Sequence, residues 1–143
     1  GGAAPSLVSN ATTPIVAAAA ASGSAALATN GKQLDGATPR VFVLRFNGDV
    51  YASEVFQLRN EITAVLGAAD AARGDEVVLR LTTGGGTVSG YGNAAGQLLR
   101  IKAAGIPLTV VAEEIAASGG YMMACCADTL VASPFALLGS IGV

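Results

Sequence analysis

Hydrophobic residues along this chain fall into short, largely apolar runs and into longer stretches with helical spacing. The runs are Val41–Phe46, Glu76–Leu81, Leu108–Ala112 and Thr129–Ala132. Short runs of this kind are typical of strands that are buried on both faces of a sheet. We therefore predict a strand at each of these positions, and burial on both faces for the first two.

The stretches that separate or follow these runs have helical character. Tyr51–Leu66 predicts a first helix, and Ser53 is placed to cap its start. Its apolar positions, which share one helical face, are Val55, Leu58, Ile62, Val65 and Leu66. Val88–Ala104 predicts a second helix, which a glycine and a proline then end. Ser118–Ala127 predicts a third.

Strands and helices thus alternate, and each connection between strands is too long for a hairpin. Long crossovers of this kind join parallel strands, so residues 39–143 are predicted to form an α/β domain with a mostly parallel sheet. Residues 1–38 differ, because Ala, Ser, Thr and Gly predominate there and aromatic residues are absent. We predict that they form a low-complexity, flexible N-terminal segment.

The most apolar part of that segment does not predict a membrane span. Ile15–Ala28 is too short and too rich in alanine, since a span needs about 20 apolar residues. Any association with a membrane is therefore expected to depend on a segment outside this chain. The chain begins with Gly1 instead of Met and ends in an apolar stretch, so we expect it to be part of a longer protein.

The composition narrows the classes of function. Charged residues make up 13% of the chain and hydrophobic residues 52%, with a mean hydropathy of +0.56. Such a low charge content is typical of a protein that forms an oligomer or lies close to a membrane. The net charge of −2 and the scattered basic residues exclude nucleic acid as a partner. With no histidine and one adjacent cysteine pair, Cys125 and Cys126, we predict no metal site, and no motif predicts a cofactor.

Two glycine-rich turns hold the candidate chemistry. Thr83–Gly86 directly follows a predicted strand, and Ser118 is followed by Gly119 and Gly120. Sites in α/β sheets form where loops leave the carboxyl ends of strands, so we expect both turns at one edge of the sheet. Glycine turns present backbone N–H groups to anions. We predict that the N–H groups of Gly86 and Gly119 form an oxyanion hole beside Ser118.

Two interpretations of Ser118 remain open on these residues alone. Serine is a preferred N-cap, and Ser118 stands at the start of a predicted helix. As a nucleophile it needs a base, and the absence of histidine excludes a Ser-His-Asp triad within this chain. A lysine is the known substitute for the histidine.

Several motifs in a fixed order resemble the SppA/SohB family of signal peptide peptidases. They are Leu79–Leu81, Gly85–Gly86, Gly90–Gly92, Ile106–Val110, Ala116–Ala124, Ser133–Ala136 and Gly139–Val143. The resemblance implies a ClpP/crotonase-like fold, truncated here at its C-terminal end. It also implies a membrane-associated serine peptidase that cleaves signal peptides or other apolar peptides, and a homo-oligomer for the full-length protein.

The resemblance assigns roles to individual residues as well. They are Ser118 as nucleophile, Gly86 and Gly119 as oxyanion hole, Ser140 as the residue that orients the base, and Gly85, Thr87 and Gly120 as substrate-binding residues. The base of the family is a lysine some tens of residues after Gly139–Val143, beyond the end of this chain. We interpret Lys102 as a solvated residue at a helix end.

One position departs from the family pattern. Where the family turn reads Ser-Pro-Gly-Gly, this chain has Thr83–Gly86, with Gly84 in the place of the proline. Glycine loosens the turn, which keeps a non-catalytic scaffold or regulatory subunit as an alternative. The second alternative is a crotonase-type acyl-CoA enzyme, which uses acidic residues. Its candidate carboxylates, which we interpret as surface or turn residues, are Asp49, Glu54, Glu113 and Glu114.

Overall fold

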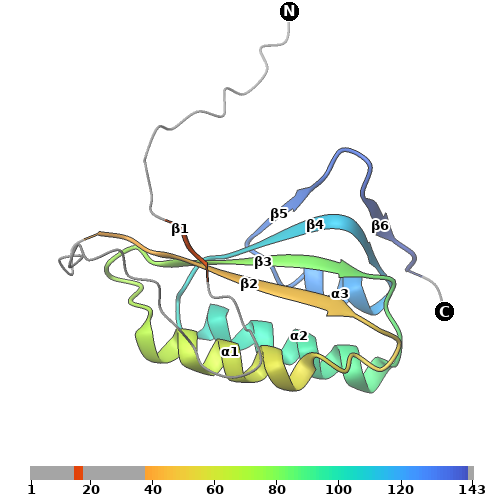
Figure 1. Ribbon diagram of the computed structural model, residues 1–143, viewed down its shortest axis with the longest axis horizontal. Coiled ribbons are helices and arrows are strands. Elements are labelled where there is room, and N and C mark those ends of the chain that lie inside the picture. Colours follow the sequence, from red (N-terminus) through yellow and green to blue (C-terminus); the bar gives the residue numbers. More distant parts are fainter. Residues whose placement is uncertain (1–14, 18–37, 142–143) are drawn as a thin grey trace, which may run out of the picture.

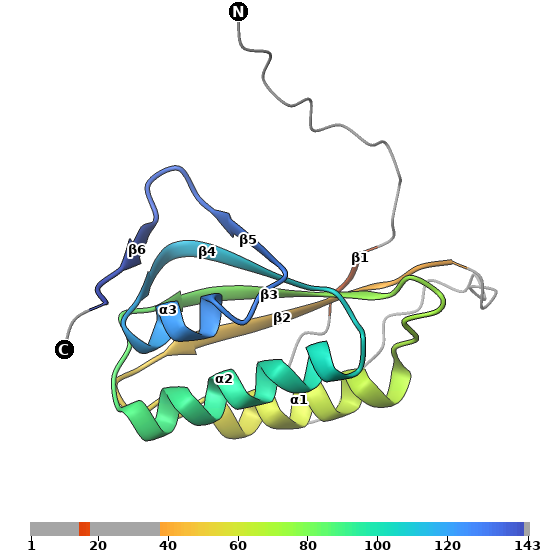
Figure 2. The same cartoon turned by 180° about the vertical axis from the view of Figure 1, so that it is seen from behind.

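A computed structural model describes residues 15–17 and 38–141 of the chain. Within these residues, six strands form one sheet and three helices cover one of its faces (Figures 1 and 2). In chain order the elements are β1 (Ile15–Ala17), β2 (Val41–Gly48), α1 (Val55–Ala68), β3 (Glu76–Thr83), α2 (Val88–Ala103), β4 (Leu108–Ala117), α3 (Gly119–Ala124), β5 (Thr129–Ala132) and β6 (Leu137–Gly139).

The strands follow the order β1-β2-β3-β4-β5 across the sheet, and β6 also pairs with β4. Every pair is parallel, so the predicted α/β fold with a mostly parallel sheet is confirmed. On the side away from β3, β4 has two partners: β5 pairs with Thr109–Ala112 and β6 with Ile115–Ala117. Because the strands are parallel, they all run toward the same edge of the sheet, where the arrowheads of β2 and β3 lie in Figure 1.

The predicted burial of the strands on both faces is wrong for the residues that the structure describes. In β3, Val77, Leu79 and Leu81 are fully buried in the core that the helices complete. Val78 is only half-buried and Arg80 is exposed on the opposite face. The sequence concealed this alternation because apolar residues occupy positions on both faces of the strand.

Helix α1 has the predicted apolar face but begins later than predicted. The buried positions are Val55, Leu58, Ile62 and Val65, and Leu66 packs half-buried against the core. The helix begins at Val55, and the predicted cap by Ser53 is wrong. Ser53 Oγ instead donates a hydrogen bond of 2.8 Å to Asp49 Oδ2, which closes the loop after β2.

β4 is longer than the predicted strand and contains a bulge. It runs past Ala112 to Ala117, and its register with β3 shifts between Leu81 and Thr83. Leu81 pairs with Ala112 whereas Thr83 pairs with Ala116, so β4 contributes more residues than β3 over this stretch. A bulge bends its strand. The outer half of β4 is thereby free to pair with β6, a strand that the sequence analysis did not predict.

Part of the N-terminal segment joins the sheet. Ile15–Ala17 forms β1 and pairs with Val41–Val43 of β2, which the prediction of a flexible segment over residues 1–38 did not include. Most of the rest of that segment lies outside the described residues, so its flexibility stays a prediction. Among the residues that the structure describes, no helix combines the length and the apolar character needed to cross a membrane.

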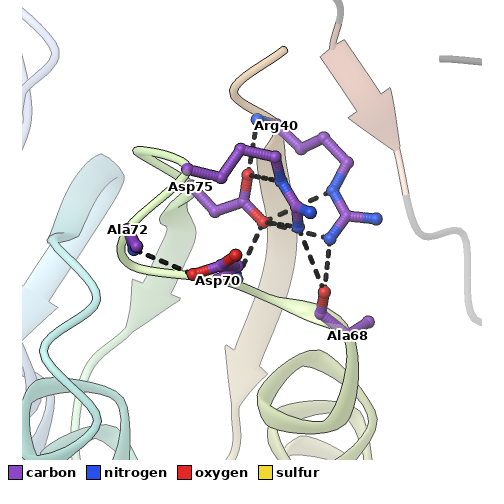
Figure 3. A network of polar contacts seen from close by, with 6 residues as sticks. Arg40, Ala68, Asp70, Ala72 and Asp75 are labelled. Atoms are coloured by element: carbon purple, nitrogen blue, oxygen red, sulfur yellow. Dashed lines mark hydrogen bonds and ion pairs between the residues drawn. The ribbon is translucent and has the colours of Figure 1, made fainter. Parts of the chain in front are cut away.

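A buried carboxylate ties together the segments that lead into β2 and β3 (Figure 3). Asp75 is fully buried and forms ion pairs with Arg40, at 3.0 Å, and with Arg73. Its oxygens also accept hydrogen bonds from the backbone N–H groups of Arg40, at 2.9 Å, and Asp70, at 3.0 Å. A buried charge with this many partners stabilises the fold only as long as the set is complete.

Replacement of Asp75 by asparagine should lower the free energy of unfolding by about 3 kcal/mol, because two guanidinium groups lose their shared anion. Glu113→Gln is the matched control, since Glu113 and Arg80 form an ion pair at an exposed position. That change should cost less than about 1 kcal/mol. Urea denaturation of the three proteins measures both values, and equal losses would contradict the structural role of Asp75.

Candidate active site

The two glycine-rich turns lie side by side at the carboxyl edge of the sheet. Gly48 pairs with Thr83 across β2 and β3, and Thr83 pairs with Ala116 across β3 and β4. The chain therefore leaves β2, β3 and β4 at neighbouring points. The prediction that both turns share one edge is confirmed.

Ser118 occupies the turn between β4 and α3 in a strained backbone conformation. Its φ is 52° and its ψ is −117°, a region that residues other than glycine rarely adopt. It holds the N-cap position of α3, but its side chain makes no cap hydrogen bond. The side chain is exposed, so the interpretation of Ser118 as a hydroxyl cap is wrong and its hydroxyl is available for chemistry.

Gly85 brings the first turn into contact with the second. Its φ is +84°, and a Cβ atom placed on it would lie 2.7 Å from Ser118 Cβ and 2.6 Å from the carbonyl oxygen of Ala117. Only a residue without a side chain permits this approach. In the described part of the chain, the N–H groups of Gly86 and Gly119 donate no hydrogen bond. The Gly119 N–H directly follows Ser118 in sequence, and the Gly86 N–H directly follows the residue that contacts Ser118. Their action as an oxyanion hole stays a prediction.

Two of the predicted substrate-binding residues have structural contacts. Thr87 is the N-cap of α2: its Oγ1 accepts a hydrogen bond of 3.3 Å from Gly90 N, and its own N–H donates to Val50 O at 2.9 Å. Gly120 is buried in α3, where a Cβ atom would lie 3.0 Å from the carbonyl oxygen of Thr83. Both residues shape the site from within, and their contact with a substrate stays a prediction.

Ser140 lies next to Ser118 because β6 pairs with the end of β4. Ala117 is in register with Gly139, and Ser118 N–H donates a hydrogen bond of 2.8 Å to the carbonyl oxygen of Gly139. Each serine directly follows one of these paired residues. Ser140 also has a positive φ, of 52°, and is exposed. The structure therefore places the predicted nucleophile and the predicted orienting serine beside each other.

A buried pair of hydroxyl groups lies beneath the two turns. Tyr91 is fully buried in α2, and its hydroxyl contacts Thr83 Oγ1 and donates to the carbonyl oxygen of Asp49 at 2.7 Å. Burial raises the pKa of Tyr91 above its ordinary value, so its hydroxyl stays protonated. Hydrogen bonds from the backbone and side chain of Ser53 lower the pKa of Asp49, which keeps this exposed carboxylate ionised.

Three of the four candidate carboxylates make contacts within the fold. Glu54 Oε2 accepts a hydrogen bond of 2.8 Å from Asn47 N, and Glu113 pairs with Arg80. Asp49 accepts from Ser53, as described above. Their interpretation as turn and surface residues agrees with these contacts, and they offer little support for an acidic catalytic pair.

Lys102 lies far from Ser118. It pairs with Asp128 at 3.1 Å near the end of α2, whereas the start of α2 adjoins the Gly86 turn. The 16 residues of this helix span about 24 Å. No group of three or more potential metal ligands occurs among the described residues.

Two protein-family models together match most of the chain. The model of "Peptidase family S49 N-terminal" matches residues 16–98, and that of "Peptidase family S49" matches residues 100–143. The chain belongs to peptidase family S49. The predicted resemblance to SppA/SohB proteins is thereby confirmed.

The curated relatives of this S49 chain carry protease names. "Probable protease SohB" of Buchnera aphidicola from Acyrthosiphon pisum is 58% identical over 104 residues, which cover 73% of this chain and 30% of the relative. The protein of the same name from Haemophilus influenzae is 57% identical, over 72% of this chain and 29% of its own. "Protease 4" of Salmonella typhi is 42% identical over 47% of this chain and 11% of its own. The chain thus spans about 30% of the length of its SohB relatives.

A solved structure extends the comparison to the fold. A mutant ClpP1 from Listeria monocytogenes superimposes with a TM-score of 0.51 at 15% identity, covering 59% of this chain and 46% of that one. At this identity the likeness concerns the fold alone. The prediction of a ClpP-like fold is confirmed.

The sequence analysis did not assign a role to Tyr91, although the residue lies in one of its motifs. The available signal was an aromatic residue with a hydroxyl group between two glycines, Gly90 and Gly92, in the first turn of a predicted helix. An apolar helix face explains the ring but not the hydroxyl. Only the structure shows that the hydroxyl lies between the loop after β2 and the end of β3.

Gly84 and Gly85 provide a matched pair of substitutions in the S49 turn. Gly85→Ala should lower the free energy of unfolding by about 2 kcal/mol or more, because alanine is strained at its positive φ and its Cβ meets Ser118. A Cβ atom at Gly84 meets nothing within 4 Å, so Gly84→Ala should leave stability unchanged or raise it by about 0.5 kcal/mol. Thermal or urea unfolding measures the difference, and equal effects would show that the turns do not touch.

Proposed function

We propose that this chain forms part of a serine peptidase of the Ser-Lys type, with Ser118 as its nucleophile. The observation that carries the proposal is the exposed Ser118 hydroxyl on a strained turn, in contact with a second turn that has an unused N–H donor. Strained backbone at a nucleophile is a recurrent feature of hydrolases, because it holds the hydroxyl away from its own main chain. The S49 family of the chain and the protease names of its relatives support the same activity.

The proposed reaction proceeds through a covalent intermediate. Ser118 Oγ forms a bond to the carbonyl carbon of a peptide, and its proton passes to a neutral lysine amine. The carbonyl oxygen becomes an oxyanion, which the N–H groups of Gly86 and Gly119 stabilise. The C–N bond then breaks, and the leaving amine takes the proton from the lysine. Water finally hydrolyses the acyl-enzyme ester in the same site.

The base is proposed to come from a lysine outside this chain. Lys102 is engaged with Asp128 at the far end of α2. The lysine that acts as the base must be neutral, because a charged ammonium has no lone pair to accept the serine proton. Burial is what lowers the pKa of a lysine enough for this. Ser140, which lies beside Ser118 in the register of β6 and β4, is proposed to orient it.

Apolar peptides, including signal peptides near a membrane, are the proposed substrates. Large hydrophobic side chains are exposed around the carboxyl edge, on both sides of Ser118. They are Val50, Tyr51, Phe56 and Val88 at the starts of α1 and α2, and Leu137, Leu138 and Ile141 in and after β6. Exposed apolar side chains of this kind support the binding of apolar peptides. Association with a membrane and assembly into a homo-oligomer are proposals for the longer protein.

A non-catalytic scaffold is the second candidate, and Gly84 in place of the family proline favours it. This turn nevertheless has the contact between Gly85 and Ser118 that catalysis needs. The acyl-CoA alternative has less support, because three of the four candidate carboxylates, Asp49, Glu54 and Glu113, are engaged in contacts within the fold.

In the full-length protein, a fluorophosphonate probe should label a single serine, and Ser118→Ala should abolish the label. The Ala variant should remain folded, because the Ser118 side chain makes no cap hydrogen bond that would be lost. Mass spectrometry of the labelled peptide and circular dichroism of the variant test both statements. A folded, lysine-containing protein that never reacts at Ser118 would establish the scaffold instead.

The 143-residue chain by itself should hydrolyse peptides at a negligible rate, because neither of its lysines, Lys32 and Lys102, is proposed as the base. Turnover of a fluorogenic apolar peptide is the measurement, with the full-length protein as positive control. Clear turnover by the chain alone that Ser118→Ala abolishes would mean that a base lies within these residues.

A further inference from the structure

Tyr91 and Thr83 form a buried hydroxyl pair at a junction of three segments. The Tyr91 hydroxyl donates to Asp49 O at 2.7 Å, and Thr83 Oγ1 donates to Gly48 O at 3.0 Å. Both acceptors belong to the chain where it leaves β2. The two hydroxyl oxygens also lie against each other, and since each group has a single proton, a hydrogen bond between them would take the place of one of those to the carbonyls. The exit from β2 is thereby bound to the end of β3 and to the first turn of α2.

The same pair reaches the first glycine turn through Thr83. Its Oγ1 accepts a hydrogen bond of 3.1 Å from the N–H of Gly85, the residue in contact with Ser118. This hydrogen bond fixes the direction in which the turn leaves β3. The N–H of Gly86 belongs to the next peptide unit, so its orientation depends on how Gly85 is held.

The pair reaches the second turn through the ring of Tyr91. A Cβ atom placed on Gly119 would lie 2.6 Å from Tyr91 Cβ, so the backbone of Gly119 rests directly on this side chain. The ring is itself held edge-on against Phe46, with centroids 6.2 Å apart and planes at 78°. Gly119 therefore rests on the Cβ end of the Tyr91 side chain, and the hydroxyl at the opposite end of that side chain is held by hydrogen bonds.

Packing alone does not account for the two hydroxyl groups. Phenylalanine and valine have nearly the same shapes as tyrosine and threonine, and they need no hydrogen-bond partner when buried. The buried hydroxyls here are satisfied, and their partners all belong to the segments around the site. Satisfied buried networks make a local structure rigid and unique.

We propose, on the basis of the proposed peptidase function, that Tyr91 and Thr83 are positioning residues for the oxyanion site. They set the Gly86 turn and the Gly119 turn in one geometry, so that both N–H groups meet the developing oxyanion. Neither residue touches the substrate. Loss of either hydroxyl is expected to slow acylation of Ser118 without weakening reversible binding.

The test compares Tyr91→Phe with Ile101→Val in the full-length protein. Ile101 is fully buried in the same helix, near the end remote from the site, so its variant controls for lost stability. The rate of inactivation by a saturating fluorophosphonate should fall about tenfold or more in Tyr91→Phe, since small displacements at a reacting centre cost this much. Its half-saturating concentration should change less than about twofold, because only the transition state needs both donors. Ile101→Val should match the wild type in both.

Thr83 supplies a second and independent pair of variants. Thr83→Val removes the hydroxyl at nearly constant shape and should slow inactivation like Tyr91→Phe. Thr83→Ser keeps the hydroxyl and should restore a rate close to that of the wild type. Equal rates for Tyr91→Phe and Ile101→Val, or failure of Thr83→Ser to outperform Thr83→Val, would overturn the proposal.

A spectroscopic measurement separates this inference from the proposed function. The amide ¹H–¹⁵N resonances of Gly86 and Gly119 should both shift in Tyr91→Phe and stay in place in Ile101→Val. If the wild-type protein does not react with the probe at all, the peptidase function fails, and these resonances alone decide the positioning role. Unmoved resonances would then reject it.

Discussion

The contact between Gly85 and Ser118 is the constraint on which the rest of the site depends. The turn after β3 and the turn after β4 approach so closely that a single methyl group at Gly85 would overlap Ser118. Parallel strands bring the turns to the same edge, but they do not by themselves bring them into contact. The absence of a side chain at Gly85 does so, because it lets the backbone of the first turn lie directly against Ser118 and Gly119.

The elements around this contact reinforce one another. β4 bends at its bulge and pairs with β6, whose Gly139 carbonyl holds the N–H of Ser118. That hydrogen bond helps to maintain a backbone conformation that costs about 1–3 kcal/mol. Beneath the turns, Tyr91 and Thr83 connect the exits of β2 and β3 with α2. β6 thus holds the backbone of Ser118 directly, and the Tyr91–Thr83 pair supports the glycine turns on either side of it.

Much of the fold was predictable because apolar spacing reports it directly. The four positions of α1 from Val55 to Val65 repeat at helical intervals and are buried as predicted. The predicted strands correspond to β2, β3, β4 and β5, with some ends displaced. Burial on both faces was wrong because the valines of β3 occur on its buried and its open face alike. β6 was missed since its few residues do not stand out in a chain this rich in hydrophobic residues.

The site was predictable only in part, for a different physical reason. Ser118 and its glycines stand out because small residues cluster in sequence. The hydroxyl pair does not stand out, since Thr83 and Tyr91 meet only through the fold. For Ser53 the local pattern was misleading. Its position predicted a helix cap, but in the folded loop its hydroxyl donates to the Asp49 carboxylate instead. Local sequence therefore shows which residues have hydroxyl groups near a turn or a helix start. The contacts made by the folded chain decide which acceptors these hydroxyl groups bind.

The division of β4 between two partners has a mechanical consequence. β5 and β6 lie along the same side of β4, but only β6 reaches Ser118. A slip of β6 by one residue would turn its side chains to the other face and carry the Gly139 carbonyl away from Ser118. The alignment of this short outer strand and the strained backbone of Ser118 are therefore coupled through a single hydrogen bond, from Ser118 N–H to the Gly139 carbonyl.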